Sequence, residues 1–186
     1  AAYHNYNYLI MMQNLSDHLS EKERKGKIRQ RLWKVRAKKV ILATGSIERP
    51  MIFDCNDRPG IMLSSAVRKY INYYGIKCGN NVVIFTSNDD AYETAISLHS
   101  KGVTIEAIID IREQSSGGLP KKCNELGIKI LWKSAVVYAE GYKKINKIHA
   151  MKLTDDNRST IGNKLKINCD LLCVSGGYTP AIHLFT

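Results

Sequence analysis

One stretch of the sequence decides the fold class, and it spans residues 82–91. It reads Val-Val-Ile-Phe-Thr-Ser-Asn-Asp-Asp-Ala. The first four residues are apolar and mostly β-branched, which is typical of a buried strand. A polar turn follows, and residues 89–101 then place Ala91, Ala95 and Leu98 on one face of a predicted helix. The stretch therefore predicts a strand, a tight turn and a helix in direct succession.

The same alternation continues on the C-terminal side. Residues 103–109 predict a second strand, residues 117–127 a second helix and residues 128–132 a third strand. Strands that alternate with helices pair in parallel through right-handed crossovers. A further helix over residues 64–74, with a serine at its start and Gly75 after it, precedes the first strand.

Beyond Ser134 the apolar residues recur with a period near two. This pattern predicts an antiparallel meander of three strands, which is followed by a buried strand at residues 171–174. The meander strands are expected at residues 135–139, 147–153 and 165–167. The fold class that we expect is α/β, a Rossmann-like domain of three layers with a parallel sheet and an antiparallel meander.

The N-terminal part has a different pattern. Residues 6–12 and 28–35 predict strands, and the second of these alternates basic with apolar or amide side chains. The polar residues 14–26 predict a loop between the two strands, and residues 39–43 predict a short apolar strand. Residues 46–60 are rich in turn formers and predict a connector between two packing units.

The turn after the first strand occupies the place of the Gly-x-Gly-x-x-Gly/Ala fingerprint of dinucleotide-binding proteins. Thr86, Asn88 and Ala91 stand at its three positions. Such a turn brings backbone amides and a helix N-terminus against a diphosphate, and its third residue must be small so that helix and strand can pack. Ala91 meets that requirement, and Asn88 tolerates a left-handed backbone less easily than glycine.

Asp110 ends the next predicted strand, 19 residues beyond Ala91. A carboxylate there can accept from ribose hydroxyls and repels a 2′-phosphate, which favours NAD over NADP, although the nearby Arg112 argues the other way. Asp89 and Asp90 in the first helical turn would repel a phosphate. A structural unit with a vestigial nucleotide site therefore remains an even alternative.

Two further strand ends predict close approach of the backbone to a cofactor. Thr44 and Gly45 follow an apolar run, and Gly176 and Gly177 follow the last buried strand. Glycine allows backbone to lie against a ligand. Each pair also fits an ordinary tight turn, and their placement on both sides of the nucleotide-like unit is more informative than either alone.

Composition excludes several function classes. The formal net charge is +11, which attracts anions without choosing among them. The basic residues between positions 24 and 39 carry no nucleic-acid motif, so we interpret them as a solvated strand face and expect no nucleic-acid partner. No apolar run is long enough for a membrane span. The five cysteines form no Cys-x-x-Cys, and the five histidines show no ligand spacing. We therefore expect a reducing compartment, no metal site and no catalytic constellation.

Several motifs together resemble one family, the alpha subunits of heterotetrameric sarcosine oxidase, which are flavoproteins with two dinucleotide-binding domains. The resemblance is densest from residue 31 to residue 92 and in the last 15 residues. The motifs are Arg-Leu-Trp-Lys-Val-Arg-Ala at 31–37, Leu-Ala-Thr-Gly-Ser-Ile-Glu-Arg-Pro at 42–50, Asn-Asp-Arg-Pro-Gly-Ile-Met-Leu at 56–63, Phe-Thr-Ser-Asn-Asp-Asp-Ala-Tyr at 85–92 and Val-Ser-Gly-Gly-Tyr-Thr-Pro-Ala-Ile-His-Leu at 174–184.

The resemblance implies a domain plan. Residues 1–58 would be strands of an FAD-type domain with a connector, residues 59–170 an inserted NAD-type domain, and residues 171–186 the return to the FAD-type domain. Thr86, Asn88, Ala91 and Asp110 would bind NAD, while Thr44, Gly45, Gly176 and Gly177 would mark the crossings between domains near cofactor. The chain would be an internal piece that does not oxidise sarcosine by itself.

The resemblance also implies the activity of the whole enzyme. It would oxidise sarcosine to glycine in the cytoplasm, with one-carbon transfer to tetrahydrofolate and with FMN or FAD held together with a partner subunit. The partners would be beta, gamma and delta subunits. Two alternatives remain open: an alpha-like subunit of an opine or amino-acid dehydrogenase, and a non-catalytic scaffold whose basic face docks a partner subunit.

Overall fold

The computed structural model describes residues 1–115 and 117–184, and the chain divides into two compact units. The first unit comprises Ala1–Gly45 together with the residues from Pro180 onward, and the second is Ser46–Thr179. The observed divisions therefore fall at residues 45/46 and 179/180, whereas the sequence led us to expect 58/59 and 170/171. Residues 185–186 of the expected return segment lie outside the described residues.

The second unit is built on a parallel sheet of five strands, as predicted. These strands are β5 (Ile61–Leu63), β6 (Asn81–Thr86), β7 (Thr104–Asp110), β8 (Ile130–Leu131) and β12 (Leu171–Ser175). Their order is β5-β12-β6-β7-β8, and every neighbouring pair is parallel. Because β12 pairs with both β5 and β6, residues 171–175 belong to this sheet and not to a separate return segment.

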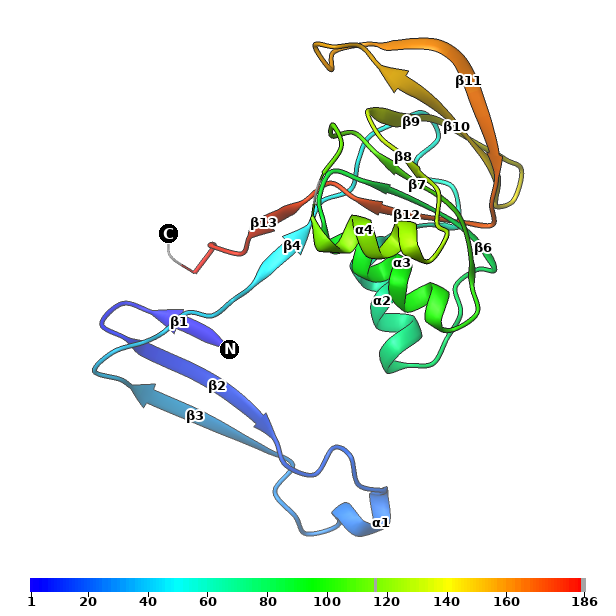
Figure 1. Cartoon of the computed structure of the whole chain (residues 1–186). Helices are drawn as coiled ribbons and strands as arrows, with labels where there is room; N and C mark the ends of the chain where they lie inside the picture. Colours follow the sequence, from blue (N-terminus) through cyan, green and yellow to red (C-terminus); the bar gives the residue numbers. More distant parts are fainter. Residues whose placement is uncertain (116, 185–186) are drawn as a thin grey trace. The chain divides into compact units, whose positions relative to one another are not determined.

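The two faces of this sheet are covered differently (Figure 1). Helices α2 (Ser64–Tyr73), α3 (Asp90–Ser100) and α4 (Gly118–Glu125) pack on one face. On the other face lies the antiparallel sheet of β9 (Ser134–Gly141), β10 (Ile145–Leu153) and β11 (Thr160–Asn168). The result is the expected architecture of three layers.

The apolar run in β6 follows from this layering. Val82 and Ile84 lie in the core shared with the helices, and Val83 and Phe85 lie in the core shared with the antiparallel sheet. Successive side chains of a strand point to opposite faces, so a strand that is covered on both sides is apolar throughout. All four side chains are buried.

The first unit is an antiparallel sheet of three strands. They are β1 (Ala2–His4), β2 (Tyr8–Asn14) and β3 (Gln30–Arg36), with β2 in the middle. The loop predicted at residues 14–26 contains the short helix α1 (Glu21–Arg24), whose start is fixed by Glu23 accepting from the Ser20 amide at 3.1 Å.

The prediction of a strand at residues 39–43 was wrong. None of these residues pairs with another strand, and Ile41 is 92% exposed. An apolar run forms a strand only where a neighbouring strand satisfies its backbone, and no described strand of the first unit does so here.

A two-stranded ribbon lies at the boundary of the second unit. It consists of β4 (Ser46–Glu48) and β13 (Tyr178–Pro180). The Arg49 amide donates to the Gly177 carbonyl at 2.9 Å, and the Gly176 amide donates to the Arg49 carbonyl at 2.8 Å. The turn-rich connector after β4 also packs inward, since Phe53 joins the core below the antiparallel sheet. Among the described residues, no helix has the length and apolar character that a membrane crossing requires.

Candidate functional site

The predicted nucleotide residues gather at one edge of the parallel sheet. Thr86 ends β6 and Asp110 ends β7, and the two are register partners. Ser175 at the end of β12 is the register partner of Thr86 on the other side. Asn88 and Ala91 follow directly, in the turn and in the first turn of α3. In open parallel sheets, ligands bind outside this carboxyl edge, while the role of these residues in binding stays a prediction.

The turn between β6 and α3 is held by its own side chains. The Thr86 hydroxyl accepts from the Asn88 amide at 3.0 Å, and the Asn88 side-chain oxygen accepts from the Asp90 amide at 3.1 Å. The Asn88 side-chain nitrogen donates to the Ser175 hydroxyl at 2.9 Å. Asn88 does not adopt the left-handed backbone considered for it. Instead, it caps the helix and ties β6 to β12.

Ala91 is fully buried in the core between the helices and the sheet. The methyl group is the whole of its side chain, so α3 can approach β6 closely at this point. This is the packing reason for a small residue at the third position of the fingerprint.

The two aspartates that begin α3 are each paired with an arginine. Asp90 accepts from Arg68 on α2 at 2.8 Å and from the Tyr178 hydroxyl at 2.6 Å. Asp89 accepts from Arg112 at 2.8 Å. Burial and the hydrogen bond to Asp90 raise the pKa of Tyr178 above its usual range, so this tyrosine stays a donor. The pairing offsets the negative charge that the sequence places where a diphosphate would bind.

Asp110 is enclosed rather than open. Its side chain is 0% exposed and accepts from the Tyr92 hydroxyl at 2.8 Å and from Arg112 Nη2 at 2.7 Å. The Arg112 side chain also donates to the other carboxylate oxygen at 3.0 Å, and so does its backbone amide at 2.9 Å. The hydrogen bond to Asp110 raises the pKa of Arg112, and burial next to Asp110 raises that of Tyr92. Asp110 can reach a ribose hydroxyl only if Arg112 moves away.

At the two predicted crossings between domains, contacts within the chain and backbone conformation explain why glycine is present. A Cβ on Gly176 would lie 3.0 Å from the carbonyl oxygens of Arg49 and Pro50, and Gly177 has a φ of +88° that favours glycine. In the first unit, Gly45 has a φ of +70°, and its carbonyl accepts from the Ala181 amide at 2.9 Å. Thr44 donates its hydroxyl to the Ala181 carbonyl. Their proximity to a cofactor stays a prediction.

Sequence reasoning missed three residues of this site, Arg68, Tyr92 and Tyr178. Arg68 on α2 and Tyr178 on β13 come from elements distant in the chain. Tyr92 occupies a position of α3 that the apolar pattern assigns to the core. The only signal was the excess of aspartate after β6, which requires positive or donor partners. Among residues 1–115 and 117–184, no group of three or more His, Cys, Asp or Glu side chains is arranged to hold a metal ion.

The comparisons with solved structures identify the fold. The chain superposes on thioredoxin reductase from T. acidophilum with a TM-score of 0.63, at 18% identity, over 81% of this chain and 48% of that one. It superposes on L-proline dehydrogenase from P. horikoshii with a TM-score of 0.54, at 19% identity, over 98% of this chain and 27% of that one. The fold is therefore the Rossmann type of FAD- and NAD(P)-binding reductases.

Sequence comparison finds relatives of one kind. No protein-family profile matches the chain. The alpha subunit of sarcosine oxidase from Corynebacterium sp. (strain P-1) is 36% identical over 180 residues, which cover 96% of this chain and 18% of the relative. The alpha subunit from Rhizobium meliloti (strain 1021) is 38% identical over 155 residues, which cover 83% of this chain and 14% of the relative. The chain thus spans less than a fifth of the length of these relatives, and it is homologous to a short segment of sarcosine oxidase alpha subunits.

Proposed function

We propose that the chain forms the nucleotide-binding region of a sarcosine oxidase alpha-type subunit, and that the turn between β6 and α3 receives the diphosphate of NAD. The observation that supports this most strongly is the placement of that turn. It joins a buried parallel strand to a helix at the carboxyl edge of the sheet, with Ala91 allowing close packing. Helix N-terminal amides at such an edge attract a diphosphate.

In this proposal the residues of the turn exchange partners when a dinucleotide binds. The Asn88 side chain, which now caps the Asp90 amide, would release that amide to a phosphate oxygen. Arg112, which is 32% exposed, would turn from Asp110 toward solvent, and Asp110 would accept from a ribose hydroxyl. Bound NAD supplies a hydride acceptor. The described residues of this chain serve only to bind and orient it.

The activity of the whole enzyme is proposed on the family relationship. The parent protein would oxidise sarcosine to glycine, pass the one-carbon unit to tetrahydrofolate and use FMN or FAD with a partner subunit. Beta, gamma and delta subunits would complete a heterotetramer. All five cysteines are free thiols, which supports a reducing, cytoplasmic compartment for this proposal.

Calorimetric titration of the 186-residue chain with NAD and with NADP tests the binding proposal. We expect saturable binding of NAD and weaker binding of NADP, because Asp110 repels a 2′-phosphate. Tighter binding of NADP by the unchanged chain would show that Arg112, and not Asp110, faces the ribose.

A second candidate function is a docking scaffold, and the composition of the first unit favours it. This unit has 10 Lys and Arg against 3 Asp and Glu, and it exposes Met12, Leu32 and Trp33 by 63%, 57% and 44%. A sheet that is both basic and apolar fits an acidic partner with an apolar face.

Capture of the beta subunit by the immobilised chain tests this second candidate. Reversing Arg29 and Arg31 to Glu should abolish capture, while reversing Lys121 and Lys122 on α4 should leave it unchanged. Equal capture by both double variants would rule out the basic sheet as the docking surface.

A further inference from the structure

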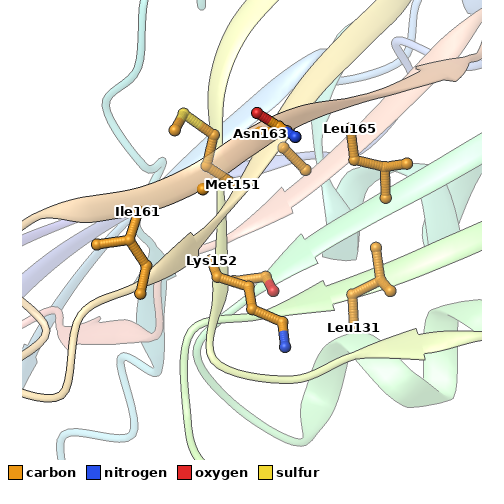
Figure 2. Close-up of a pocket in the computed structure, with 9 residues that line it drawn as sticks. Leu131, Met151, Lys152, Ile161, Asn163 and Leu165 are labelled. Carbon is orange, nitrogen blue, oxygen red and sulfur yellow. The ribbon is translucent and has the colours of Figure 1, made fainter.

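A cavity of about 310 Å³ lies beside the β10–β11 hairpin. Figure 2 shows its side chains, which come from β8 to β11. The lining residues are Leu131, Ser134, Ala150, Met151, Lys152, Ile161, Gly162, Asn163 and Leu165. Cavities of about 300–1,000 Å³ are the usual size for small organic ligands.

Two features of the strands coincide at the cavity, a short strand and a bulge. Strand β8 has only two residues, so the parallel sheet ends while the hairpin above it continues. In addition, β11 bulges away from β10. Ala150 pairs with Leu165 and Lys152 with Ile161, which leaves three residues of β11 opposite Met151 alone. Gly162 in this bulge has a φ of +81°. Leu131 of β8 and residues of this bulge line the cavity.

The interior of the cavity is mostly apolar. Ala150 forms part of the buried core, and Leu131 packs against the same core. Ile161 and Leu165 remain 53% and 43% exposed, although both line the cavity. An apolar group that fills this space would remove their surface from water, which is favourable in proportion to the area covered.

Lys152 gives the cavity a positive charge. Within the part of the chain that the structure describes, Lys152 makes no ion pair, whereas Lys133 pairs with Asp155 and Lys147 pairs with Glu140. The hairpin as a whole, residues 145–168, has five Lys and Arg against two Asp. An apolar cavity with an unpaired ammonium group complements a ligand that has an apolar body and one negative charge.

We propose that this cavity binds a small amphipathic carboxylate, with its apolar part between Leu131, Ile161 and Leu165 and its carboxylate on Lys152 Nζ. The alternative occupant, another protein surface, is less well supported. Ile161 and Leu165 are the only large apolar side chains of the lining that are exposed, and a stable protein interface needs more than about 1,000 Å² of buried surface.

Decanoate, used below its micellar concentration, is the probe for this site. Titration into the ¹⁵N-labelled chain should give saturable shifts at residues 131, 150–152 and 161–165. Lys152→Gln should weaken decanoate binding by about fivefold, the loss expected for one exposed ion pair. Lys166→Gln on the same hairpin is the matched control, because Lys166 does not line the cavity, and it should bind decanoate as the unchanged chain does.

Decanol and an Asn88→Ala variant complete the test. Decanol should bind the unchanged chain more weakly than decanoate, and Lys152→Gln should not alter decanol binding. Asn88→Ala should leave decanoate binding unchanged, which separates this site from the proposed nucleotide site. The proposal would be overturned if decanoate binding did not saturate, or if the shifts fell outside the cavity. It would also be overturned if Lys152→Gln and Lys166→Gln weakened decanoate binding equally.

Discussion

Replacing Arg112 by Met tests the charge network at the carboxyl edge of the sheet. The change removes the guanidinium group that donates to Asp110 and Asp89, and it keeps most of the side-chain volume. Asp110 is 0% exposed, so its carboxylate would keep only the Tyr92 hydroxyl and a backbone amide as donors. A buried charge that loses its partner costs about 3–5 kcal/mol.

The expected loss is at the lower end of that range, about 3 kcal/mol, because water can reach the space left by a side chain that was 32% exposed. Trp132 is a suitable reporter, since its ring stacks on Tyr92 at a centroid distance of 6.2 Å. Urea unfolding would be followed by fluorescence in a Trp33→Phe background, where Trp132 is the only tryptophan.

The matched control is the double variant Arg112→Met with Asp110→Asn. A neutral amide at position 110 has no charge to leave unpaired, so the double variant should recover most of the lost stability. A loss below about 1 kcal/mol for Arg112→Met, the size of an ordinary surface pair, would refute the reasoning. So would a double variant that is no more stable than the single one.

Three further predictions follow from particular contacts. Asn88→Ala should lower the free energy of unfolding by about 1–2 kcal/mol in urea titration, because the Asp90 amide loses its cap and Ser175 its partner; an unchanged midpoint would contradict this. Gly176→Ala should be destabilising by about 1–3 kcal/mol, since its Cβ would press on two backbone carbonyls, whereas Gly118→Ala, which meets nothing within 4 Å, should not lower the thermal midpoint. The hydrogen bond from Arg29 holds the pKa of Asp17 below its ordinary value of 3.8. The contribution of the Asp17 carboxylate to the stability of the fold is therefore present above that value, and it is lost as the pH falls through the lowered pKa. Asp17→Asn should consequently speed amide exchange at Leu15, whose amide donates to the Arg29 carbonyl, at pH 6, and the difference between the two forms should shrink as the pH is lowered.

The sequence was informative where local pattern and tertiary packing agree. Residues 82–85 are apolar throughout because both faces of β6 are covered, and the alternation of strands and helices after them predicted the parallel sheet correctly. The three meander strands were also confirmed, because a sheet with one covered face leaves a period of two.

Other features depend on partners that no local pattern contains. The apolar residues 39–43 lack a strand to pair with, and β12 enters the parallel sheet between β5 and β6 through long-range pairing. The position of Asp110 at the end of β7 was predicted correctly. The burial of Asp110 was not predicted, because it depends on hydrogen bonds from the Tyr92 hydroxyl on α3 and from the Arg112 side chain.

NMR titration of the ¹⁵N-labelled chain with NAD would show whether the turn between β6 and α3 receives a dinucleotide. We expect saturable shifts of the amides of residues 86–92 and 110–112, together with a changed signal of the Asn88 side-chain amide as it leaves Ser175. A folded chain whose amides at these positions do not respond to NAD would contradict the claim and leave the turn with a purely structural role.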